Sequence, residues 1–164
     1  MLRYWTGTIV LFCSSLSIFA QTKAAPPIVD FETLEKLLQQ ENDTTSVFIF
    51  WATWCIPCIK ELPFFEALNT EMATQPVKIW LVSLDFRNQV NQKLVPFLRK
   101  HHIQTQVIVL YEPDANKWID KVHPAWSGAI PATLIQRNQN ISFIEKQFET
   151  YEELRQIVET FVKS

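Results

Sequence analysis

Two cysteines three residues apart carry the clearest chemistry in the sequence. Cys55 and Cys58 enclose Ile56 and Pro57 within the segment WATWCIPC. A spacing of three places both sulfurs on one face of a helix, close enough to bridge with little backbone movement. Cys55 would lie at the helix N-terminus, where unpaired N–H groups and the helix dipole stabilise a thiolate. We therefore expect Cys55 to be a nucleophilic thiol and Cys58, one turn further on, to be the less exposed resolving thiol.

Two other interpretations of the pair stay open from the residues alone. An inert disulfide would close so short a loop that it would stabilise little through chain entropy. A zinc site would need two more ligands, and the sequence has no second cysteine pair. The adjacent His101 and His102 would point in different directions on a helix. We therefore expect no metal ion and no cofactor.

The residues around the pair predict that it joins a buried strand to a helix. Residues 46–52 (SVFIFWA) form a continuous apolar run rich in β-forming residues, which is typical of a strand buried on both faces. Trp51 in this run is expected to be a core residue. A helix should follow from about Ile56 to Met72, and Pro57 suits its first turn, where a missing N–H costs nothing.

The rest of the chain predicts alternating helices and strands. Further helices are expected over Phe31–Gln40, Asn88–His102, Asp114–Val122 and Thr150–Val162, and further strands over Val77–Leu84, Gln106–Tyr111, Ala132–Gln136 and Ile141–Lys146. Asp30 and Asp114 are the expected N-caps of two of these helices, and Pro96 predicts a kink or restart in another. Alternation followed by a hairpin and a closing helix predicts an α/β domain with a mixed central sheet.

Composition excludes several classes of protein. A length of 164 residues fits one domain, and a 13% aromatic content excludes a disordered chain. Only two glycines occur, which excludes a glycine-rich phosphate loop. The net charge is −2, and no basic run is longer than Arg99-Lys100. We therefore expect no nucleic-acid partner, because phosphate neutralisation needs a positive surface.

The first residues predict export. Arg3 precedes an apolar stretch that ends near Ala20, which is the pattern of a secretory signal peptide. Cleavage is expected after Ala20, with Ala24 and Ala25 as alternative sites, or else the segment is retained as a membrane anchor. The chain is thus divided into a signal peptide (1–20), a linker (21–29) and one domain (30–164). We expect an exported, periplasmic protein.

Two motifs together resemble a known family. WATWCIPC followed by IKELP fits the W-C-x-x-C-x-x-E-x-P pattern of exported thioredoxin-like proteins of the TlpA/ResA type. Downstream, the segment GAIPATL at 128–134 resembles the G-x-P-T-T segment of that family. The resemblance covers the chain from about Asp30 to its end. It implies a thiol–disulfide oxidoreductase with a thioredoxin-like α/β fold, in which helices flank both faces of a central mixed β-sheet.

The resemblance also implies roles for individual residues. Cys55 would attack the substrate, and Cys58 would resolve the mixed disulfide. Glu61 matches a glutamate that takes and returns a proton at the buried cysteine, and its place one turn after Cys58 makes that reach feasible; the alternative is a solvated residue on the helix surface. Pro131 would be cis beside the sulfurs, and Ile130 would pair its backbone with an extended substrate.

Four positions outside these motif roles also carry expectations. Trp54, beside the nucleophile, is expected to form part of an exposed docking surface. Trp126 either lines a substrate groove or packs under the downstream loop, and His123 is expected to be a structural loop residue. Ile49 stands where thioredoxins carry a buried acid, so proton transfer would depend on Glu61.

The residue types favour a reductant. A histidine in place of Pro57 would stabilise the thiolate and make the disulfide strongly oxidising. An exported reductant needs a membrane donor of reducing equivalents, which the resemblance implies. Its partners would be substrate proteins with disulfides, apocytochrome c among the family's substrates, and we expect a monomer. The alternatives are a disulfide oxidase or isomerase, a non-enzymatic binding module, and a peroxidase, which is disfavoured because Ala52 stands where peroxiredoxins have threonine.

Overall fold

The computed structural model describes residues 24–40 and 42–163. The predicted signal peptide and the first three residues of the predicted linker lie outside the described residues. Within the described part, six strands form one sheet in the order β1-β4-β3-β2-β5-β6. The strands are β1 (Ile28–Val29), β2 (Thr45–Trp51), β3 (Val77–Ser83), β4 (Gln106–Leu110), β5 (Ala132–Arg137) and β6 (Asn140–Ile144). Strands β1 to β4 pair in parallel, whereas β5 and β6 pair antiparallel, so the sheet is mixed as predicted.

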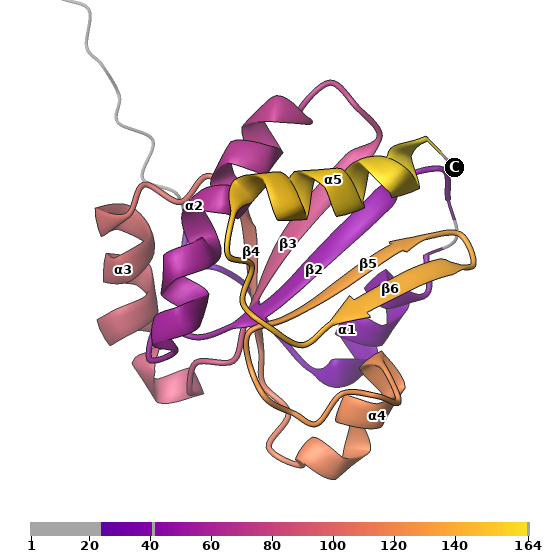
Figure 1. The fold of residues 1–164 in the computed structure, drawn as a ribbon. Coiled ribbons are helices and arrows are strands. Elements are labelled where there is room, and N and C mark those ends of the chain that lie inside the picture. Colours follow the sequence, from indigo (N-terminus) through magenta and orange to yellow (C-terminus); the bar gives the residue numbers. More distant parts are fainter. Residues whose placement is uncertain (1–23, 41, 164) are drawn as a thin grey trace, which may run out of the picture.

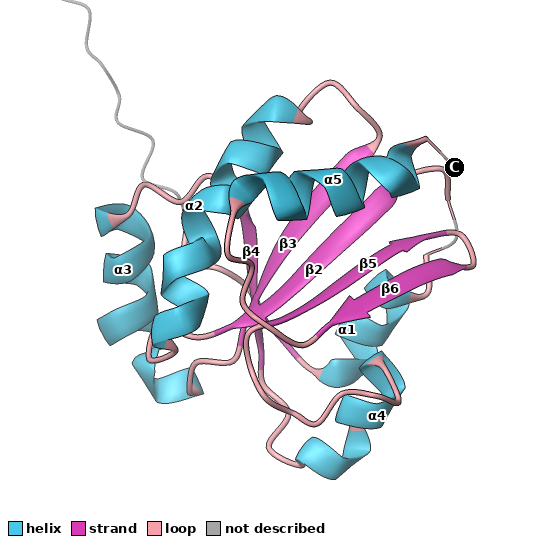
Figure 2. Cartoon of the chain, viewed as in Figure 1, coloured by secondary structure: helices cyan, strands magenta, loops and turns pink. Residues whose placement is uncertain are grey.

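Helices cover both faces of this sheet (Figure 1). They are α1 (Phe31–Leu38), α2 (Ile56–Glu71), α3 (Val95–Lys100), α4 (Ile119–Val122) and α5 (Tyr151–Val162). Helices α2, α3 and α5 pack on one face and α1 and α4 on the other, as Figure 2 shows. The predicted arrangement of a mixed sheet between two helical layers is therefore confirmed.

Strand β2 is buried along its whole length, which explains why it is apolar from Val47 to Trp51. Every residue from Thr45 to Trp51 is buried. Because successive side chains point to opposite faces, Val47, Ile49 and Trp51 join the core under α2 and α5, while Phe48 and Phe50 join the core under α1 and α4. The strand thus holds the two cores together, and the cysteine pair follows its end directly. The prediction that Trp51 is a core residue is confirmed.

The helix predicted over Asn88–His102 is not continuous. A 3₁₀ turn at Arg87–Gln89 and a π-helical segment at Val90–Leu94 precede α3, which begins at Val95. Pro96 lies in the first turn of α3, and it has no N–H with which to continue a regular ladder from the preceding turn. The expected restart at Pro96 is therefore confirmed, whereas the single helix was wrong.

Two local expectations need correction. Asp114 does not cap a helix through its side chain; it precedes a 3₁₀ turn at Ala115–Lys117, and its carboxylate lies 3.5 Å from Lys117 Nζ. Residues Ile28–Val29 of the predicted linker form β1 and pair with β4. By contrast, Asp30 caps α1 as predicted, since its carboxylate accepts the Thr33 N–H at 2.9 Å. None of the helices in the described part of the chain is long and apolar enough to cross a membrane.

Candidate active site

The two cysteines are joined in a disulfide at the junction of β2 and α2. The S–S distance is 1.98 Å and the Cα atoms are 5.3 Å apart. Cys55 is the N-cap of α2, and its Sγ accepts the backbone N–H of Cys58 at 3.3 Å. Cys55 is 5% exposed and Cys58 is fully buried. The sulfur of Cys55 therefore lies where the helix N-terminus stabilises negative charge, and it is the sulfur that solvent reaches.

The downstream motif lies against the disulfide. The Ile130–Pro131 peptide bond is cis, and the Ile130 carbonyl oxygen lies 3.7 Å from Cys55 Sγ. Residues 75 positions apart in the sequence are thus brought together because β5 pairs antiparallel with β2. Pro131 is buried and Ile130, the residue before it, is partly exposed.

The loop before Ile130 is fixed by contacts below and beside it. Trp126 is 4% exposed, donates its indole N–H to the Ala129 carbonyl at 2.8 Å, and packs on Phe50 with ring centroids 4.6 Å apart. Of its two interpretations, packing under the loop is the one that the structure supports. Glu145 accepts the Ala129 N–H at 3.1 Å and also the Ser127 N–H and hydroxyl.

Apolar side chains next to the cysteines in the sequence are exposed. Trp54 is 55% exposed and Ile56 is 69% exposed, and Pro57 is exposed as well. Phe86, which follows β3, is 62% exposed and was missed by sequence reasoning, because an apolar residue after a strand is more often buried. His123, by contrast, is a structural loop residue: it stacks on Phe143 and accepts the Ala125 N–H through Nδ1.

Glu61 is a buried carboxyl group one turn after Cys58. It is fully buried, so the solvated helix-surface interpretation is wrong. Its Oε2 accepts the Phe148 N–H at 2.9 Å, and its Oε1 has no hydrogen-bond partner among the described residues. Burial raises the pKa of Glu61 to about 7, although the Phe148 N–H opposes the shift. A group with this pKa exchanges protons readily near neutrality.

A second buried carboxylate was not predicted. Asp85 is 1% exposed and accepts the Thr53 hydroxyl at 2.5 Å, the Thr53 N–H at 3.1 Å and the Ser83 hydroxyl at 2.8 Å. Thr53 lies two residues before Cys55. The only signal in the sequence is an acid placed at the end of an apolar strand.

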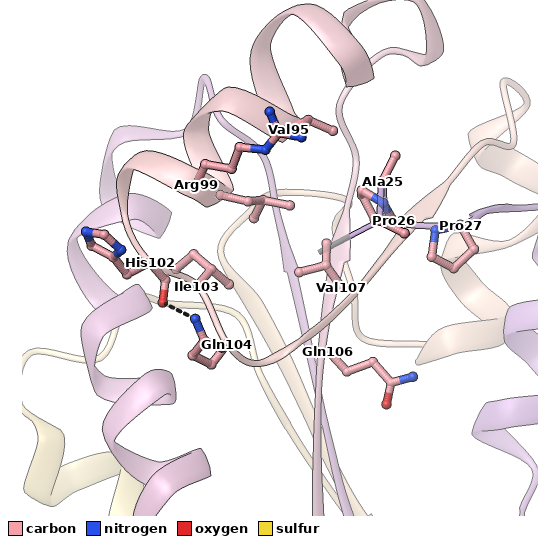
Figure 3. Close-up of a pocket in the computed structure, with 12 residues that line it drawn as sticks. Ala25, Pro26, Pro27, Val95, Arg99, His102, Ile103, Gln104, Gln106 and Val107 are labelled. Carbon is pink, nitrogen blue, oxygen red and sulfur yellow. Dashed lines mark hydrogen bonds between the residues drawn. The ribbon is translucent and has the colours of Figure 1, made fainter. Parts of the chain in front are cut away.

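A cavity of about 500 Å³ lies between residues 24–27, α3 and the start of β4 (Figure 3). Cys55, Cys58 and Pro131 are not among its lining residues. In residues 24–40 and 42–163, no three His, Cys, Asp or Glu side chains gather in a way that could hold a metal ion.

Comparison with known proteins places the chain in a family. It is 26% identical over 105 residues to sporulation thiol-disulfide oxidoreductase A of Bacillus subtilis, covering 63% of this chain and 64% of that relative. It is 50% identical over 36 residues to thiol-disulfide oxidoreductase ResA of Oceanobacillus iheyensis, covering 22% of this chain and 19% of that relative. The chain thus spans less than two thirds of the length of these curated relatives.

Solved structures agree with the fold. A thioredoxin-related protein from Neisseria meningitidis serogroup B superposes with a TM-score of 0.63 at 19% identity, covering 77% of this chain and 91% of that one. This likeness establishes a thioredoxin-like fold. The family model described as "AhpC/TSA family" matches residues 27–144, which is more than half of the chain and includes both motifs at the disulfide. The chain is therefore a thioredoxin-fold member of the AhpC/TSA family, and its relatives include the ResA-type proteins.

Proposed function

We propose that this chain is an exported thiol–disulfide oxidoreductase that reduces disulfides in substrate proteins through Cys55 and Cys58. The observation that carries the proposal is the position of Cys55, which caps α2, accepts the Cys58 N–H on its sulfur and faces the Ile130 carbonyl. The names of the curated relatives, both thiol-disulfide oxidoreductases, support the activity.

The reaction follows from the two different environments of the sulfurs. In the reduced protein, the Cys55 thiolate attacks one sulfur of a substrate disulfide, which forms a mixed disulfide and releases one substrate thiolate. Cys58 then loses its proton to the Glu61 carboxylate and attacks Cys55 Sγ. The second substrate thiolate leaves, the Cys55–Cys58 disulfide forms, and two electrons have passed to the substrate. Both substrate thiolates take protons from water.

The surface around the disulfide supports a protein substrate. Trp54 and Ile56 expose apolar area next to Cys55, and an extended segment of substrate would pair with the backbone of Ile130. A segment that is extended or unfolded around its own cysteine would suit this pairing.

The reducing direction and the location rest on separate features. Pro57 between the cysteines provides no imidazolium to stabilise the Cys55 thiolate, which favours a low reduction potential. The signal-like pattern around Arg3 favours export to the periplasm or retention at the membrane. A reductant in an oxidising compartment must have its Cys55–Cys58 disulfide reduced again after each turnover, so we propose a membrane thiol donor as its partner. We also propose that it works as a monomer.

The reduction potential of the pair tests the proposal. We expect a value at or below about −250 mV when the protein is equilibrated with thiol–disulfide buffers, because reductants of this fold lie in that range. The Cys58→Ser variant, which cannot form the bond, serves as the control for the fluorescence or alkylation signal. A value near −120 mV, roughly that of a strong oxidant, would reverse the direction, and the lack of any reversible couple would favour a binding module.

A further inference from the structure

Asp85 is a buried carboxylate that the proposed reaction does not use. Three donors from two segments converge on it: the N–H and hydroxyl of Thr53 and the hydroxyl of Ser83. A carboxylate that accepts several hydrogen bonds is held in a single orientation, and such bonds to a charged group are stronger than those between neutral groups. Asp85 therefore ties the segment before the cysteines to the end of β3.

The tied segment is the one that presents the reacting sulfur. Leu84 donates its N–H to the Trp51 carbonyl at 2.8 Å, and Cys55 donates its N–H to the Ala52 carbonyl at 3.0 Å. Thr53 lies between these two backbone bonds, and its N–H and hydroxyl both donate to the side chain of Asp85. Trp54, which comes next, is more than half exposed, so packing does little to fix it and its direction depends on the backbone at Thr53.

We propose that Asp85 is a positioning residue, which acts through Thr53 to hold Trp54 in the orientation that a protein disulfide docks against. This role rests on the proposed function, because it concerns substrate docking at that site. The hydroxyl of Thr53 links the carboxylate to the segment before the cysteines, whereas the hydroxyl of Ser83 donates to the carboxylate and accepts the Asp85 N–H at 3.1 Å, both on the strand side. The two hydroxyls therefore contact the same group but have different consequences.

This difference gives a matched pair of variants. Thr53→Val and Ser83→Ala each remove a hydroxyl that donates to the Asp85 carboxylate. Ser83→Ala also removes the acceptor of the Asp85 N–H, so it should lose at least as much stability as Thr53→Val. In an assay of protein-disulfide reduction, we expect Thr53→Val to raise KM about fivefold to tenfold while kcat changes less than about twofold, a loss in the range of one ordinary protein hydrogen bond. Ser83→Ala should change KM less than about twofold. Thr53→Ser, which keeps the hydroxyl, should restore the KM of the natural sequence.

Small disulfides separate docking from chemistry. The rate with a small aromatic disulfide, which needs no extended docking surface, should be unchanged in all three variants. Equal KM changes in Thr53→Val and Ser83→Ala, or none in either, would overturn the role of Asp85, as would a failure of Thr53→Ser to restore KM. If the natural sequence reduces no disulfide of either kind, the proposed function itself fails, and that result is distinguishable because it does not depend on any variant.

Discussion

Replacing Cys55 by serine should lower the rate of protein-disulfide reduction by at least about 1,000-fold, because a hydroxyl of ordinary pKa is not a nucleophile toward a disulfide at neutral pH. Cys55 Sγ is the sulfur at the helix N-terminus and the one that solvent reaches. No other cysteine among the described residues could replace it, since Cys58 is fully buried. The loss should be seen equally with protein and small disulfides, measured with a chemical reductant as the electron source.

The matched control is Cys58→Ser, which keeps the attacking sulfur and removes the resolving one. This variant should react once and stop as a mixed disulfide of one substrate molecule per protein, which can be isolated by non-reducing electrophoresis and released by dithiothreitol. The contrast between no adduct with Cys55→Ser and a stable adduct with Cys58→Ser assigns the order of attack. An adduct of the Cys55→Ser variant, formed through Cys58, would contradict the roles that we assign to the two cysteines from their burial.

The features that the sequence predicted well are local ones. The apolar run that becomes β2, the pair spaced by three residues and the start of α2 at Ile56 each depend on neighbours within one or two turns. The same holds for Asp30, whose cap contact reaches only to Thr33. Such features can be predicted from the sequence because the residues that form each contact lie within a few positions of one another.

The features that sequence reasoning missed depend on residues far apart. Strand β1 has two residues and exists only because β4 pairs with it. Two residues are too few to show the alternating pattern that predicts a strand. Asp85 looks like a solvated loop acid until Thr53, 32 residues earlier, is placed against it. Trp126 could not be assigned in advance, because its burial comes from Phe50 on β2 and from other rings that the fold brings together.

Glu61 shows the same limit within a predicted helix. Helix α2 is apolar on more than one side, with Leu62, Phe65 and Leu68 buried besides Glu61, so periodicity could not say which side faces solvent. Glu61 faces the protein interior, where the Phe148 N–H of the segment before α5 donates to its carboxylate. The two buried acids thus contact different parts of the chain around the cysteines. Asp85 binds Thr53 in the segment before Cys55, and Glu61 lies one turn after Cys58 in α2.

The stability of the protein should fall as the pH rises, through Glu61. Burial raises the pKa of Glu61 to about 7 in the folded protein, from 4.5 for an ordinary glutamate. Between these values the folded protein keeps a proton that the unfolded chain has lost, so each step up in pH favours unfolding until the folded group also ionises. From pH 5 to pH 8 this one group should cost about 2.5 kcal/mol in the free energy of unfolding, at 1.36 kcal/mol per pKa unit.

A Glu61→Gln variant isolates that contribution. The neutral amide cannot ionise, so the variant should gain about 2.5 kcal/mol relative to the natural sequence between pH 5 and pH 8, measured by urea unfolding of the oxidised protein at both values. Glu149→Gln, which removes an exposed glutamate near the same loop, is the control and should leave the difference near zero. A Glu61→Gln difference that does not grow with pH would contradict a raised pKa.

The same substitution tests the proton transfer. Glu61 can accept the proton of Cys58 only when it is a carboxylate, so resolution of the mixed disulfide should speed up through about pH 7 in the natural sequence. Glu61→Gln should remove that rise and accumulate the mixed disulfide, while the first attack by Cys55 keeps its own pH dependence. Rapid-quench trapping of the mixed disulfide from pH 6 to pH 8 measures both steps. An unchanged resolution rate in Glu61→Gln would leave Glu61 a purely structural buried acid and assign the proton of Cys58 to water.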